Sequence, residues 1–94
     1  MDAQVARARA QLGAREGNVV DAERLFKRAA GLFQELAVPF AVAVTRLEHA
    51  EWLTAHSRFE EAEPLRAEAR AAFERLDAKR WLERMSGLPL AAVG

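Results

Sequence analysis

The chain has 94 residues, 51% of them apolar and 30% charged, which is enough for one small domain with a core and argues against disorder. Its 14 basic and 14 acidic residues give a formal net charge of zero, whereas a nucleic-acid-binding surface needs a clustered positive field. It has no cysteine, hence no disulfide, thiolate metal site or thiol nucleophile, and no apolar run of the ~20 residues that span a bilayer. We therefore expect a cytoplasmic protein without a membrane or nucleic-acid partner.

Apolar residues recur at steps of three and four along almost the whole chain, and this spacing predicts an all-α fold. The expected helices cover about 2–15, 19–36, 39–55, 58–77 and 79–86. The connections between them are two to four residues long, so consecutive helices are expected to run antiparallel.

Several residues mark the expected helix boundaries. Gly17 suits a left-handed residue at the end of the first helix, and Asn18 with Asp21 forms a weak capping box for the second. Pro39 suits the first turn of the third helix, where its missing N–H costs nothing. The Ser-Gly-Leu-Pro stretch at 86–89 is expected to end the last helix.

The fourth helix carries one favourable signal and one conflict. Ser57 and Glu60 fit the capping box, in which the Ser hydroxyl and the Glu carboxylate satisfy backbone donors reciprocally. Pro64 removes the hydrogen bond to the Glu60 carbonyl, so a modest kink rather than a break is expected there.

Residues 57–76 repeat much of residues 17–36 at a constant offset of 40. The identical pairs are Ala22/Ala62, Glu23/Glu63, Leu25/Leu65, Ala29/Ala69, Phe33/Phe73 and Leu36/Leu76. What repeats is a packing pattern and not a reactive group, and small residues at fixed contact points are typical of stacked helix pairs. We predict one domain over 1–94, with one repeat at about 2–37, a second at about 39–77 and a terminal helix at about 79–86.

Part of this pattern resembles the tetratricopeptide repeat signature. The residues that carry the resemblance are Ala50, Leu53, Phe59, Ala62 and Ala69, and in the other copy Ala10, Ala22, Phe26 and Ala29. The period of 40 exceeds the usual 34, and the long helices resemble the arrays at the C-terminal ends of large bacterial regulators such as ATPase-coupled transcriptional activators and nucleotide cyclases. The resemblance implies a protein-interaction or assembly module within a signalling or transcription-regulating protein.

The resemblance also implies that the first helix of each pair lines a groove that binds a protein or peptide. Carried over by position, the groove residues are Gln4, Arg7, Gln11 and Arg15 from the first repeat, and Val44, Leu47, Glu48, Glu51 and Thr54 from the second. Trp52 lies at the margin of the predicted core, where it serves either as an interface anchor or in ordinary packing.

No constellation of residues indicates catalysis or a cofactor. His49 and His56 lie two helical turns apart, about 10 Å along the axis, which is too far to share one metal ion. Glu60 and Glu61 suit the first turn of a helix through its dipole alone. We therefore expect that the chain is not an enzyme and that it binds no cofactor or metal ion.

Stacked repeats usually need about three units, whereas this chain offers two pairs and one helix. At least one end of the stack should therefore expose an apolar face, which either a homodimer hides or the terminal helices cap. The alternatives to a protein-binding module are a self-association module and a small helical bundle that senses a ligand held between its helices.

Overall fold

The computed structural model describes residues 1–86, and it confirms an all-α fold over that range. The helices are α1 (Ala3–Arg15), α2 (Val19–Glu35), α3 (Pro39–Ala55), α4 (Phe59–Arg75) and α5 (Lys79–Ser86). Every boundary lies within two residues of the prediction, and the largest difference is at the end of α4, at residue 75 against the predicted 77. The stop expected from residues 87–89 lies outside the described residues.

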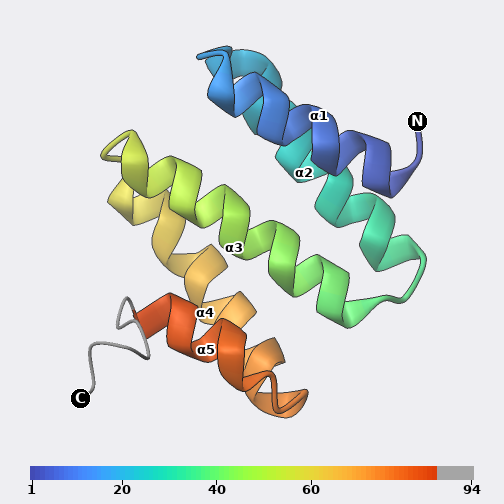
Figure 1. Ribbon diagram of the computed structural model, residues 1–94, viewed down its shortest axis with the longest axis vertical. Helices are drawn as coiled ribbons and strands as arrows, with labels where there is room; N and C mark the ends of the chain where they lie inside the picture. The colour runs from blue at the N-terminus through green and yellow to red at the C-terminus, as the bar shows by residue number, and fades with distance from the viewer. Residues whose placement is uncertain (87–94) are drawn as a thin grey trace.

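The helices form two layers (Figure 1). The layer toward the viewer contains α1, α3 and α5, and α2 and α4 lie behind them. Each helix packs on the next one along the chain, so that α1 with α2 and α3 with α4 form hairpins and α2 against α3 joins the hairpins. The resulting stack measures 41 × 30 × 23 Å.

The repeat seen in the sequence is also a repeat of structure. The start and end of α4 lie 40 residues after those of α2, and α5 starts 40 residues after α3. The alanines at the four equivalent contact points, Ala10, Ala22, Ala50 and Ala62, are all 0–1% exposed and belong to one apolar cluster. The chain is therefore a helical repeat of two hairpins and the first helix of a third, in which equivalent alanines occupy equivalent places.

The core extends along the stack in three apolar clusters. One joins the first four helices through the alanines above together with Leu25, Phe26, Trp52 and Leu53. A second joins α3, α4 and α5 around Phe73 and Leu47, and the third is a smaller cluster around Phe33. Trp81 of α5 stacks on Phe73 with 5.5 Å between ring centroids, as expected for a helix that covers the second hairpin.

The four turns between helices share one conformation, and they recur every 20 residues. The left-handed residues are Gly17, Ala37, Ser57 and Asp77, with φ of 75°, 55°, 60° and 54°. In each turn the following N–H donates to the carbonyl five residues earlier, over 2.8 Å from Asn18 to Gly13 and 2.9 Å from Arg58 to Leu53. This is the Schellman ending of a helix, and glycine, which suits it best, occupies only the first of the four positions.

The capping box predicted at Ser57 is wrong. Ser57 takes the left-handed position that ends α3, so α4 starts later and its N-cap is Arg58, which makes no side-chain cap hydrogen bond. The Schellman turn uses Ser57 for its backbone conformation, and the hydroxyl is one residue too early to reach the first turn of α4.

The other boundary predictions agree with the structure. The Asn18 Oδ1 accepts a hydrogen bond from the Asp21 N–H over 3.3 Å, and Gly17 is left-handed. Pro39 is the first residue of α3, and α4 continues past Pro64 to Arg75.

Replacing Ala37 with glycine should raise stability. An alanine in the left-handed region costs about 1–2 kcal/mol, which exceeds the extra unfolded-chain entropy of a glycine. We expect Ala37→Gly to raise the free energy of unfolding by about 0.5–1 kcal/mol in urea denaturation. Ala67→Gly, on the exposed face of α4, is the matched control and should lower it by about 1 kcal/mol; a loss in both variants would contradict the turn assignment.

Candidate interaction surface

The layer of first helices, α1, α3 and α5, contains the groove residues expected from the sequence, and several of them bind one another. The Arg7 guanidinium donates two hydrogen bonds of 2.7 Å to the two carboxylate oxygens of Glu48, and the Gln11 amide donates a third of 2.8 Å. The Glu48 side chain is only 10% exposed, and its hydrogen bonds raise the pKa of Arg7. This bidentate pair joins α1 to α3. Arg7 and Glu48 therefore lie in the layer of first helices and also hold the two hairpins together.

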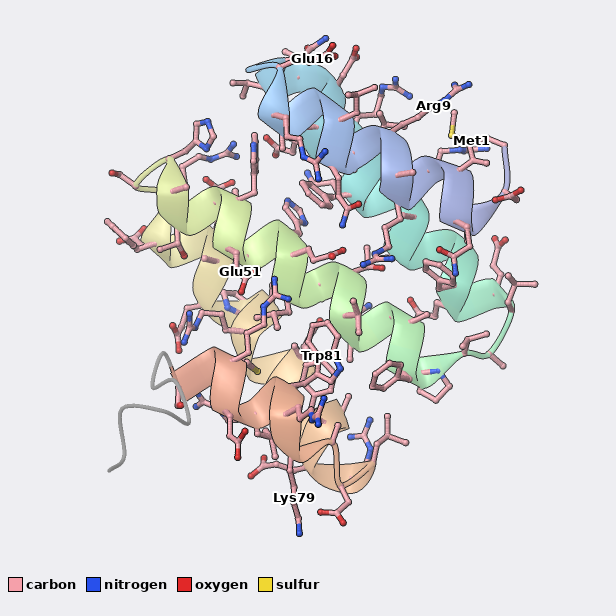
Figure 2. All side chains as sticks on the ribbon, viewed as in Figure 1. Met1, Arg9, Glu16, Glu51, Lys79 and Trp81 are labelled. Carbon is pink, nitrogen blue, oxygen red and sulfur yellow. The ribbon has the colours of Figure 1, made fainter. Side chains whose placement is uncertain are left out.

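A second pair of charges joins α3 to α5. Arg84 donates to Glu51 through Nη2 at 2.6 Å and Nε at 3.0 Å, and its guanidinium lies 5.1 Å from the centre of the Trp81 ring. Both side chains of the pair are about half exposed, so water and a partner can compete for them. Figure 2 shows Glu51 and Trp81 on the side of the molecule that faces the viewer, between α3 and α5.

The remaining sequence candidates divide by burial. Gln4 and Arg15 are exposed and Thr54 is half-buried, so these three are accessible on α1 and α3. Val44, Leu47 and Trp52 are 6%, 1% and 7% exposed, because they pack into the core. Contrary to the expectation, these three side chains do not line an open groove and cannot touch a partner in this conformation.

Trp52 belongs to an aromatic group between the hairpins. Its ring lies 6.2 Å from Phe26, 6.2 Å from His49 and 4.6 Å from His56, and the Arg58 guanidinium lies 5.6 Å from its centre. Of the two roles proposed for Trp52, the structure assigns ordinary packing, since the Phe26 side of the ring is closed by α2.

Arg58 joins the second helices of the two hairpins. It binds Glu23 of α2 with hydrogen bonds of 2.7 and 3.1 Å, and Glu61 of α4 with bonds of 2.6 and 2.7 Å. These bonds raise the pKa of Arg58 and lower the pKa of Glu23 to about 2. The stabilising contribution of Glu23 is therefore complete above its ordinary pKa of 4.5, and it is lost as the pH falls from there toward about 2.

Sequence reasoning missed the structural roles of Arg58 and Arg84. Their partners Glu23 and Glu51 lie 35 and 33 residues away, and no local pattern marks such pairs. The only available signal was the period of 40, which places helices of successive repeats side by side.

His49 is the least expected polar residue of the interface between the hairpins. It is 6% exposed, stacks on Phe26 with 5.3 Å between centroids and 10° between planes, and its Nε2 has no hydrogen-bond partner. Burial lowers its pKa below the ordinary 6.5, against the smaller opposing effect of Glu23. Protonation would leave a cation in a buried contact with the Phe26 ring of α2.

His49 makes the fold sensitive to mild acid. Because the unfolded chain binds a proton more readily than the folded one, stability is full above pH 6.5 and falls as the pH drops below it. We expect the free energy of unfolding to fall between about pH 7.5 and about pH 5, and this fall to be smaller in His49→Gln. Urea denaturation at both pH values checks this; an unchanged difference in the variant would assign the acid effect to another group.

Two adjoining hollows lie between α2 and α4, on the opposite side from the groove expected from the sequence. Their volumes are about 430 and 420 Å³, and Gln34, Arg46 and Glu68 line both. Arg46 crosses between the helices, with Glu68 at 3.1 Å and Gln34 at 3.4 Å. His49 and Phe26 line the second hollow, and Gly31 on its α2 wall has open space where a side chain would lie.

Within residues 1–86, no group of acidic, histidine or cysteine side chains could hold a metal ion, and no helix is long and apolar enough to cross a membrane. Comparison with models of known protein families, with curated proteins and with solved structures finds no match to this chain.

Proposed function

We propose that this chain is a protein-interaction module that works by presenting a rigid stack of helix pairs to another protein. The observation that carries the proposal is the repeat itself, with equivalent buried alanines in successive hairpins and inter-hairpin ion pairs from Arg7 and Arg58. Helix pairs stacked in this way build extended surfaces without a reactive centre. The resemblance to tetratricopeptide repeats points to the same function, and a place in the cytoplasm within a larger bacterial regulator is part of this proposal.

The proposal is tested by capture of partners with the chain as bait, using variants that block one surface each. Thr54→Arg alters the layer of first helices, Gly31→Arg fills the hollow between α2 and α4, and Leu12→Asp places a charge on the outer face of α1. Gly31 has nothing within 4 Å of an added Cβ, and a non-glycine residue favours the helix, so this variant should fold well.

We expect a partner that the parent chain captures in a fixed ratio and that one of the three variants loses while its melting temperature stays within a few degrees. Capture that is equal for all three variants, or absent for the parent chain, would contradict binding through the stack. Light scattering of the parent chain checks the self-association alternative, which predicts a mass that rises with concentration.

A ligand-sensing role is the second candidate, and the two hollows favour it. Hollows of about 430 and 420 Å³ are within the size range of small-molecule sites. A compound that raises the melting temperature of the parent chain, but not of Gly31→Arg, would support this role. Equal stabilisation of both chains would place the compound elsewhere.

A further inference from the structure

The second hollow, of about 420 Å³, is built by three helices and is mostly apolar. Both α2 and α4 pack on α3, so these two helices form its walls and α3 forms its floor. Small-molecule sites in proteins are usually lined in this way, with a few polar groups among apolar side chains. The apolar lining consists of Phe26, Ala30, Gly31, Leu53, Pro64 and Leu65.

His49 brings a hydrogen-bonding atom without a partner to the lining of this hollow. Among the buried side-chain nitrogen and oxygen atoms of residues 1–86, only its Nε2 makes no hydrogen bond. Burial holds the pKa of His49 below its ordinary 6.5, so the ring is neutral at pH 7.5. A buried polar atom that lacks a partner costs free energy, and a ligand that supplies the partner recovers it.

The charged side chains of the hollow, in contrast, already have partners. A charged ligand would have to separate one of these ion pairs or remain in the hollow without a counter-charge, and both are costly. An uncharged ligand leaves every pair in place. The pairs are Arg46–Glu68 over 3.1 Å, Lys27–Glu23 over 3.4 Å and Arg58–Glu61 over 2.6 Å.

The hollow has room for a ligand next to His49. Gly31 has open space where a side chain would lie, which leaves the α2 wall free for an apolar body. Lys27 and Glu61 act on the charge of His49, and their side chains are 66% and 56% exposed, so both can move aside. Because water does not reach Nε2 in the free protein, a ligand group bonded to it displaces no water from that atom.

We propose that the second hollow binds a small uncharged molecule with an apolar body and one hydroxyl group, and that this hydroxyl pairs with His49 Nε2. A hydroxyl both donates and accepts, so it matches the imidazole nitrogen in either tautomer. The apolar body lies between Gly31 of α2 and Pro64 of α4. This inference rests on the ligand-sensing role, the second candidate function, and names its ligand class.

Two compounds of the same shape test the role of the hydroxyl. The probe is 4-ethylphenol, and 1-ethyl-4-methylbenzene, which carries a methyl group in place of the hydroxyl, is its matched control. We expect a Kd below about 1 mM for the probe in NMR titration at pH 7.5, and binding at least about ten times weaker for the control. The charged analogues 4-ethylbenzoate and 4-ethylbenzylamine should also bind at least about ten times more weakly.

Variants of the chain locate the site. His49→Phe keeps a buried ring without Nε2 and should abolish the preference for the hydroxyl; His49→Leu serves the same purpose if that variant does not fold. Gly31→Arg fills the hollow and should weaken both compounds by about tenfold or more. Leu12→Asp, on α1 and away from the hollow, should leave binding unchanged. The ¹⁵N shift of His49 Nε2 should move with the probe and not with its control.

Equal affinity for 4-ethylphenol and its control, no binding below about 1 mM, or a preference that survives in both His49 variants would overturn the proposal. Nuclear Overhauser contacts between Phe26 and a residue outside 1–86 in the ligand-free chain would assign the hollow to the chain itself. If another compound is lost from Gly31→Arg but shows no need for a hydroxyl, the ligand-sensing role stands and this inference fails. Partner capture is measured separately, so the protein-interaction module does not depend on either outcome.

Discussion

Phe73→Ala should destabilise the chain more than any other single truncation considered. Phe73 is 0% exposed and forms the centre of the cluster that joins α3, α4 and α5. It stacks on Trp81 at 5.5 Å and meets the edge of Phe40 at 6.0 Å. Removing the ring leaves a cavity in a core that cannot collapse freely, so we expect a loss of about 3–5 kcal/mol in the free energy of unfolding.

Phe59→Ala is the matched control, because the same atoms are removed from a ring that is 60% exposed. We expect a change within about 0.5 kcal/mol. Urea denaturation followed by circular dichroism measures both variants. If Phe73→Ala does not fold, Phe73→Leu should still fold and lose about 1–2 kcal/mol. A loss in Phe59→Ala as large as that in the Phe73 variants would contradict the core described here.

Ala22→Leu and Ala62→Leu should each cost about 1–3 kcal/mol, because both add volume where the two helices of a hairpin touch. Ala22 is 0% and Ala62 1% exposed. A Cβ at Gly13 would lie only 3.4 Å from the Ala22 backbone N and 3.7 Å from its Cβ, so α1 leaves no space for a larger side chain at residue 22.

The control for the alanine variants is Ala67→Leu, which makes the same change on the exposed face of α4. Because alanine and leucine have similar helix propensities, we expect a change within about 0.5 kcal/mol. Thermal unfolding compares the three variants. A large loss at residue 22 with none at residue 62 would show that the two hairpins do not pack equivalently.

Local chemistry explains why the helices could be predicted to within two residues. Spacing, Pro39 and the Asn18 cap act within one or two turns of the chain, so their effect can be read from neighbouring residues. The one wrong boundary prediction, the capping box at Ser57, was also made from neighbouring residues. Serine fits an N-cap by type, but Ser57 occupies the left-handed position of the Schellman turn that ends α3, as residues 17, 37 and 77 do in the other turns.

The candidate surface was harder to predict, because it depends on which faces of the helices are covered. The period of 40 was enough to assign Val44, Leu47 and Trp52 to the first helix of a pair. It did not show that their side chains are buried in the core. Ion pairs such as Arg7–Glu48, 41 residues apart, depend on the distance between helices of successive hairpins. Whether a charged side chain is free for a partner or bound to its neighbour follows from that distance and not from its type.

By itself, the sequence determined that this protein is a series of antiparallel helices in which one helical hairpin is repeated. Helix propensity, caps and apolar spacing are properties of residues close together in the chain. Only the tertiary structure decided which charges pair, that His49 and Trp52 are covered, and that Val5 and Leu12 are left open. The physical reason is that burial is a property of two surfaces together. The same position of the repeat is core on α3, where α2 packs over it, and is exposed on the face of α1 that is turned away from α2.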